Sequence, residues 1–145
     1  MKRTASFLAA FSLVLLPARG LAEEGATTPE PRFERAVSSD SKSTRDEKTV
    51  FSPDTPKIFI VYRIAGATEG TRLRAVWYAE KVDGLAENAQ VADLSTQTGA
   101  GKRFMGSFSY SKPQKGWPNG LYRVELFINE KPARMVVFRV KSGTP

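Results

Sequence analysis

A cluster of turn residues leads directly into a long alternating strand, and this junction constrains the fold more than any other part of the chain. The turn residues occupy positions 116–120. Tyr122, Val124 and Leu126 then follow two residues apart, separated by charged side chains. A period of two predicts a β-strand with one side facing a core. The pattern therefore favours an antiparallel sheet that is covered on one face by a second sheet.

Short strands and turns alternate through the rest of the chain from residue 49 onward. A short strand is expected at Val50–Phe51, and longer ones at 57–64, 72–80, 91–96, 104–110, 121–128 and 134–140. Residues 81–90 read as an irregular connection, and the last two strands as a hairpin around residues 129–131. No stretch keeps a helical period over three turns. Six or seven short strands with frequent turn signals predict an all-β antiparallel sandwich.

The first 48 residues differ in composition from the rest. Residues 1–22 combine a basic start, an apolar run at 7–16 and small residues before position 23, which is the layout of a cleaved signal peptide. The apolar run is shorter than the roughly 20 residues that span a bilayer. No Cys follows it, so a lipid anchor is not expected. Residues 23–48 contain only two large apolar residues, Phe33 and Val37, and are predicted to be a disordered linker.

These boundaries place the folded domain at residues 49–145 and the mature protein in the periplasm or outside the cell. The chain has neither Cys nor His. Most metal sites and most nucleophile–base pairs need one of the two, so no metal, cofactor or catalytic residue is predicted. Ser107, Ser109 and Ser111 alternate on one strand face without a His to activate them. A Ser–Lys arrangement is the catalytic alternative that the sequence leaves open.

Several segments together carry a resemblance to a known architecture. They are Phe51, 55–59, 75–77, 116–124 and 138–140. In this pattern the chain resembles immunoglobulin or fibronectin type III-like β-sandwich domains, and more narrowly small secreted bacterial domains of uncharacterised function. The resemblance covers residues 50–141 and brings no catalytic residues with it. Trp77 is expected between the two sheets, and Tyr122 is expected to form a tyrosine corner with the preceding loop.

Alternation also predicts which side chains point away from the core. In an immunoglobulin-like topology, the strands around Trp77, Val124 and Phe138 are neighbours in one sheet. The residues expected on its outer face are Arg74, Val76, Tyr78, Arg123, Phe127, Met135, Val137 and Arg139. An apolar surface framed by Arg is typical of protein interfaces. We therefore expect binding to another envelope protein or self-association, unless the linker or residues 81–90 cover this face.

Two other functions remain open at this point. Residues 49–145 hold fourteen basic and eight acidic residues, a net charge of +6. Basic residues interleaved with aromatic ones suit an anionic polymer such as lipopolysaccharide, an acidic glycan or nucleic acid. The candidates for that site are Lys102, Arg103, Lys112, Lys115 and Trp117. The third possibility is a small inhibitor of an extracytoplasmic enzyme that acts through exposed loops such as residues 111–119.

Overall fold

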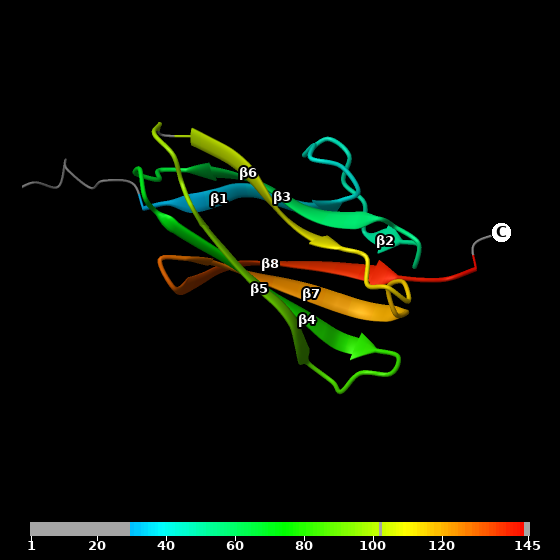
Figure 1. Cartoon of the computed structure of the whole chain (residues 1–145). Helices are drawn as coiled ribbons and strands as arrows, with labels where there is room; N and C mark the ends of the chain where they lie inside the picture. The colour runs from blue at the N-terminus through cyan, green and yellow to red at the C-terminus, as the bar shows by residue number, and fades with distance from the viewer. Residues whose placement is uncertain (1–29, 102, 144–145) are drawn as a thin grey trace, which may run out of the picture.

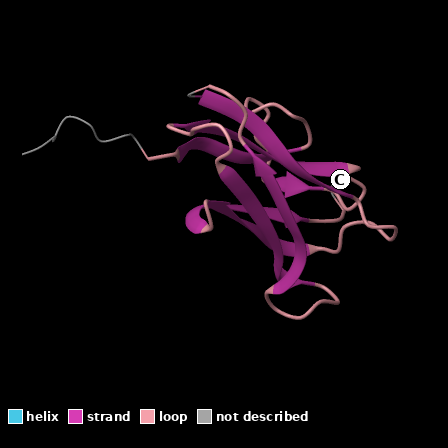
Figure 2. Cartoon of the chain, turned by 60° about the vertical axis from the view of Figure 1, so that its left-hand side comes forward, coloured by secondary structure: helices cyan, strands magenta, loops and turns pink. Residues whose placement is uncertain are grey.

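The computed structural model describes residues 30–101 and 103–143, and within them all regular structure is β-strand (Figures 1 and 2). The strands form two facing layers. One sheet has the order β1 (Arg32–Ser39), β3 (Lys57–Ala65) and β6 (Arg103–Ser111). The other has the order β2 (Val50–Phe51), β8 (Lys131–Val140), β7 (Gly120–Ile128), β4 (Arg72–Val82) and β5 (Ala89–Gln97). The predicted all-β sandwich is confirmed, with eight strands rather than six or seven.

All strand pairs are antiparallel except β2 with β8, which run parallel. The expected closing hairpin is present as β7 and β8. Its turn consists of Asn129 and Glu130, which have φ of 48° and 66°. Positive φ at both central residues is the signature of a tight hairpin turn that matches the twist of the flanking strands. The Arg72 backbone N–H donates to Asn129 Oδ1 at 3.0 Å, so the turn is also tied to β4.

The predicted disordered linker at 23–48 is wrong for the part that the structure describes. Residues 32–39 form β1, which pairs with β3 along its length. Phe33 is buried and meets the Tyr62 ring edge-on at 5.6 Å. The loop after β1 folds back on it, because Ser39 Oγ donates to Asp46 O at 2.7 Å and Arg35 Nε to Thr44 O at 3.2 Å. The described domain therefore begins before residue 49. The predicted signal peptide and residues 23–29 lie outside the described residues.

The β4–β5 region also differs from the prediction. Residues 81 and 82 continue β4, and the connection that follows is a short turn. The strand expected at 91–96 is longer and spans Ala89–Gln97. Its ladder with β4 shifts register between Trp77 and Tyr78, which leaves Val91 as an extra residue. That bulge breaks the alternation of β5 and explains why the sequence pattern of this strand is weak.

The core lies between the sheets and includes both aromatic residues that were expected there. Trp77 and Tyr122 are buried, at 1% and 2% exposure. Phe138 on β8 contacts both: its ring centre lies 5.9 Å from that of Trp77 and 5.1 Å from that of Tyr122. The Tyr122 hydroxyl donates to Pro118 O at 2.6 Å, as a tyrosine corner requires. The predicted orientation of both side chains is confirmed.

Candidate protein-interaction surface

The predicted surface residues lie together on the side of the five-stranded sheet that faces away from the other sheet; we call this side the outer face. The order β8–β7–β4 confirms that the three strands are neighbours. Along the ladders, Tyr78 pairs with Arg123 and Arg123 with Val137. One row further on, Glu125 lies between Val76 and Met135. Arg74 pairs with Phe127 in the next row, and Arg139 pairs with Leu121 at the opposite end.

Exposed apolar side chains are concentrated at one edge of the outer face. Met135 is 58% exposed and Val137 is 40% exposed on β8. Val50, at 49% exposure, joins them because β2 pairs with β8 in parallel and sets Val50 beside Arg139. We call Val50, Met135 and Val137 the apolar strip. Val50 was not predicted on this face, since only the parallel pairing of β2 with β8, which no local pattern signals, brings it there.

The middle of the outer face is closed by arginine side chains. The Arg74 guanidinium donates to both carboxylate oxygens of Asp93, at 2.8 and 2.6 Å, and to Glu130 at 3.1 Å. It also lies 5.6 Å from the centre of the Phe127 ring. The hydrogen bonds from Arg74 hold the pKa of Asp93 below its usual value. Arg74 is thus fixed in place over the sheet by groups on three different segments.

Arg123 is held in the same way one row further along the sheet. Its guanidinium lies 4.3 Å from the centre of the Tyr78 ring, and Nε donates to Glu125 at 3.2 Å. A further contact is made with the Asn88 side chain. Val76, between the two arginines, is only 2% exposed although it points outward. It is therefore unavailable to a partner, and the accessible apolar area is the strip on β8 and β2.

A shallow hollow of about 330 Å³ adjoins the apolar strip. Met135 and Glu125 line it together with residues of the β7–β8 hairpin, namely Leu126, Phe127, Pro132, Ala133 and Arg134. The β7–β8 ladder shifts register between Leu126 and Phe127, which locally separates the side chains of the two strands. The hollow offers room for a side chain of a partner that lies across Met135 and Val137.

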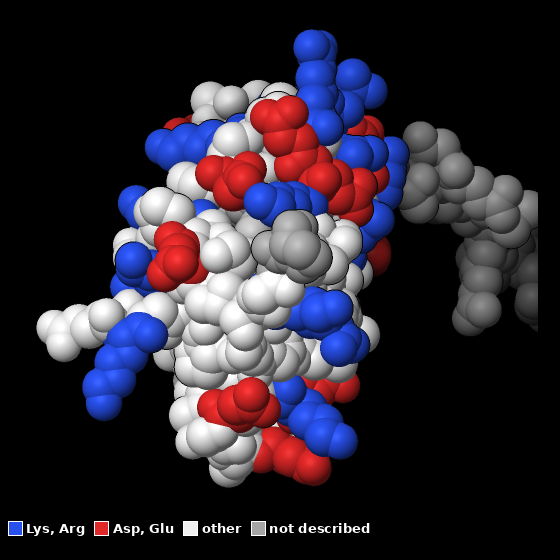
Figure 3. All heavy atoms as spheres, turned by 90° about the vertical axis from the view of Figure 1, so that its right-hand side faces the viewer, with Lys and Arg blue, Asp and Glu red and all other residues white. Residues whose placement is uncertain are grey.

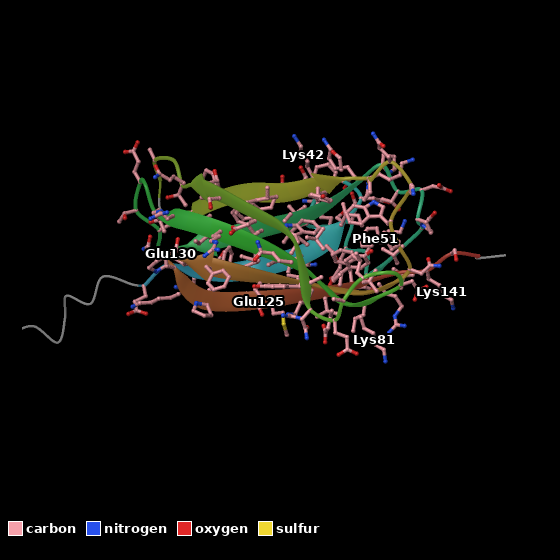
Figure 4. All side chains as sticks on the ribbon, turned by 60° about the horizontal axis from the view of Figure 1, so that its bottom comes forward. Lys42, Phe51, Lys81, Glu125, Glu130 and Lys141 are labelled. Carbon is pink, nitrogen blue, oxygen red and sulfur yellow. The ribbon has the colours of Figure 1, made fainter. Side chains whose placement is uncertain are left out.

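Two parts of the predicted linker pack differently: residues 30–33 lie beside the β7–β8 hairpin, whereas residues 40–48 lie on the other side of the molecule. Residues 40–48 contact β1 through the hydrogen bonds of Ser38, Ser39 and Arg35. In Figure 4, Lys42 of this loop and Glu125 of the outer face lie on opposite sides of the sandwich. Within the segment 81–90, the Asn88 side chain contacts Arg123 on the outer face. Within the described part of the chain, Val50, Met135 and Val137 of the apolar strip remain exposed.

The residues considered for an anionic polymer do not form one cluster. Arg103 begins β6, whereas Lys112 and Lys115 follow its other end, about 26 Å away at roughly 3.3 Å per residue. Trp117 is buried, and its indole N–H donates to Thr55 O at 2.9 Å, so its ring packs over the end of the sandwich. Lys102 lies outside the described residues. Basic and acidic side chains are also interspersed on the face shown in Figure 3.

Comparisons with solved structures identify the architecture. An immunoglobulin-like protein from Pseudomonas aeruginosa matches with a TM-score of 0.53 and 13% identity, over 80% of this chain and 100% of that chain. The alkylpurine DNA glycosylase AlkC from Pseudomonas fluorescens, bound to DNA containing an abasic site analog, matches with a TM-score of 0.55 and 12% identity over 81% of this chain. The fold is an immunoglobulin-like β-sandwich. No protein-family model and no curated protein matches the chain.

At these identities the matches establish the immunoglobulin-like fold alone. The chain spans only 32% of the length of the glycosylase, and the whole length of the immunoglobulin-like protein. Across residues 30–101 and 103–143, no group of three or more acidic side chains is placed to hold a metal ion. The same residues include no helix of the length and hydropathy needed to cross a membrane.

Proposed function

We propose that this immunoglobulin-like domain is a non-catalytic accessory module that binds another protein of the bacterial envelope through its outer face. The observation that carries the proposal is the apolar strip, in which Met135 and Val137 on β8 and Val50 on the neighbouring β2 are 40–58% exposed. Small soluble domains rarely leave such side chains together at the surface unless they are part of an interface. The arginine networks beside the strip supply a pre-formed polar rim.

The rigidity of the rim supports binding with little loss of conformational entropy. Arg74 and Arg123 are already hydrogen-bonded and stacked on aromatic rings, so a partner does not have to order them. Arg139, by contrast, is exposed beside Val50 and Val137. It is the arginine of this face that is most accessible to a carboxylate of the partner. The preferred partner surface is thus apolar in the centre with an acidic group near Arg139.

The proposed compartment is the periplasm or the extracellular space. It rests on the signal-peptide pattern of residues 1–22 and on the absence of a Cys after it. A domain without disulfides can remain folded in an oxidising compartment through its core alone, and this sandwich buries a continuous aromatic core. The mass of the mature protein, recovered from an osmotic-shock fraction, should correspond to a chain that begins at Glu23.

A pair of matched variants tests the interaction. Met135→Asp combined with Val137→Asp places two charges in the apolar strip and should abolish recovery of the partner with the tagged protein. Lys42→Asp is the control, because Lys42 is exposed in the loop after β1, on the opposite side of the sandwich from Glu125. It should leave recovery unchanged. Sedimentation of the two variants tests self-association in parallel. Identical recovery and sedimentation for the two variants would contradict the proposed surface.

A further inference from the structure

A second surface of a different kind lies at the edge of the three-stranded sheet. β6 is the last strand in the order β1–β3–β6. Nine consecutive residues pair with β3, from Arg103 opposite Ala65 to Ser111 opposite Lys57, with no shift of register. Its other edge carries no strand among the residues that the structure describes. An edge of this kind presents backbone N–H and C=O groups in a row to any extended segment that comes beside it.

The hydrogen bond that closes the ladder shows which backbone groups point outward. The Lys112 N–H donates to Pro56 O at 2.9 Å, so positions 112 and 56 form a pair of the hydrogen-bonded type. In an antiparallel ladder the two types alternate with a period of two. Residues 104, 106, 108 and 110 therefore direct their backbone groups toward β3. The groups of Met105, Ser107 and Ser109 point toward the free edge.

The other two long edge strands carry features that hinder the addition of a strand. β1 has a bulge between Phe33 and Arg35, and Phe33 O accepts a hydrogen bond from Arg134 at 3.1 Å. β5 has the bulge at Val91 and a charged side chain, Asp93, in the middle of the strand. β6 has no bulge against β3, no proline, and no charged residue between its first residue and Lys112. It lacks the usual protections of an edge strand.

The charges at the two ends of β6 indicate what kind of segment fits. Arg103 is 78% exposed, with its only described acidic neighbour, Glu34, at 4.0 Å. Lys112 and Lys115 are exposed just beyond the other end. A second copy of β6, paired antiparallel about Ser107, would set Arg103 opposite Ser111 of the partner strand, one residue from its Lys112, at both ends. The positive charge gathered at each end of such a pair disfavours self-pairing, whereas acidic residues there are attracted.

An apolar pocket of about 450 Å³ lies past the Lys112 end. Leu85 and Val91 line it from the β4–β5 side, and the β6–β7 loop residues 113–118 and Tyr122 complete the lining. The pocket therefore lies near the edge strands β5 and β6, which are the last strands of their two sheets. Leu85 is half-exposed there. The pocket suits an apolar side chain of a segment that continues beyond Ser111.

We propose that the free edge of β6 binds an extended peptide segment of another protein, uncharged along its centre and acidic at both ends, by adding it as a strand to the three-stranded sheet. Main-chain hydrogen bonds at Met105, Ser107 and Ser109 provide affinity, and Arg103 and Lys112 select the acidic ends. This site is separate from the outer face of the five-stranded sheet. It does not depend on the function proposed above.

Amide hydrogen exchange of the mature protein tests this directly. The probe is a capped synthetic peptide of alternating threonine and valine with two aspartates at each end. A peptide with the same centre and lysines at both ends is its control. The acidic peptide should slow exchange of the Met105, Ser107 and Ser109 amides about tenfold or more when saturating. The amides of Phe104 and Phe108 already donate to β3 and should change little.

Three variants separate strand addition from other contacts. Ser107→Pro removes the central free-edge donor while leaving the ladder with β3 intact, and should lose binding. Ser107→Ala keeps the N–H and should bind like the parent. The double variant Arg103→Glu with Lys112→Glu should bind the lysine-ended peptide in preference to the acidic one. This reversal tests the proposed site even if Ser107→Pro fails to fold.

Several results would overturn the proposal. One is equal binding of the acidic and lysine-ended peptides by the parent protein. Another is protection of the β6 amides that appears without peptide and rises with protein concentration, because it would identify a second copy as the occupant. Binding of the acidic peptide without protection at Met105, Ser107 and Ser109 would show that a purely electrostatic contact, of the kind an anionic polymer makes, explains the affinity.

Discussion

The Arg123 guanidinium lies 4.3 Å above the centre of the Tyr78 ring, its direct cross-strand neighbour on the outer face. The same guanidinium is bonded to Glu125 and Asn88. A cation held over an aromatic face contributes about 0.5–2 kcal/mol, depending on how far it is desolvated. The stack therefore stabilises the sheet and also forms part of its outer surface.

Substitution of Arg123 should reveal that contribution. We expect Arg123→Ala to lower the free energy of unfolding by about 1–2 kcal/mol in urea melts, since the stack and its hydrogen bonds are lost. Arg123→Lys keeps the charge but not the planar group and should recover only part of the loss. Full stability of the alanine variant would mean that the contact contributes nothing measurable in solution.

The core position of Trp77 predicts a larger effect. Trp77→Ala should lower the free energy of unfolding by about 3–5 kcal/mol, because a large buried aromatic side chain is replaced by a cavity. The Trp77 indole N–H has no hydrogen-bond acceptor among the described residues. Trp77→Phe should therefore cost much less than the alanine change, as no buried hydrogen bond is broken. An alanine variant that melts like the parent protein would rule out this core position.

A side chain added at Gly106 should destabilise the core by overpacking, the opposite of leaving a cavity. Gly106 lies across from Tyr62, and a Cβ added there would meet the Tyr62 hydroxyl and lie 2.7 Å from Cζ of the ring. Gly106→Ala should destabilise the domain by about 1–3 kcal/mol. Gly99→Ala is a suitable control, since its Cβ would lie 3.7 Å from Phe104 and clash with nothing. Tyr62→Phe should reduce the cost of Gly106→Ala, and additivity of the two changes would contradict the contact.

Two buried tyrosines predict a loss of stability at alkaline pH. Burial raises the pKa of Tyr62 and of Tyr122 from 10.0 to about 12, and Asp83 adds to the shift at Tyr122. Between these values the unfolded chain loses the phenolic protons while the folded protein keeps them. Stability should thus be constant with respect to these groups below pH 10. Above it, stability should fall by about 1.4 kcal/mol per pH unit for each tyrosine.

Denaturant melts between pH 9 and pH 12 can check this dependence. Tyr122→Phe should reduce the alkaline slope by about half, because one of the two groups no longer titrates. Below pH 10 the same variant should be less stable than the parent, since it lacks the hydrogen bond to Pro118 O. A slope that is the same in the parent and in the variant would show that Tyr122 ionises equally in both states.

The architecture was largely predictable because β4, β7 and β8 each have one buried side. Trp77, Val124 and Phe138 alternate with outward residues, and a period of two is the strongest local signal that a strand can give. β1 was not predictable in this way. Its bulge separates the buried residues Phe33 and Ala36 by three positions rather than two, and its charged neighbours gave the segment the composition of a linker.

The residues of the outer face were predicted, but not which of them are exposed to a partner. Alternation decides which way Val76 points, yet its burial depends on side chains from neighbouring strands that close over it. Val50 reaches the face only through the parallel pairing of β2 with β8. The free edge of β6 likewise follows from strand order, a property of the whole chain that no segment encodes by itself.

The most direct measurement is site-specific photo-crosslinking at Val137 in cells that produce the protein, with Lys42, in the loop after β1, as the control position. Both side chains are exposed, and Lys42 lies on the opposite side of the sandwich from Glu125 of the outer face. A photoreactive residue at position 137 should give one discrete protein adduct that position 42 does not give. Adducts of equal yield from both positions, or none from position 137, would contradict an interaction surface on the outer face.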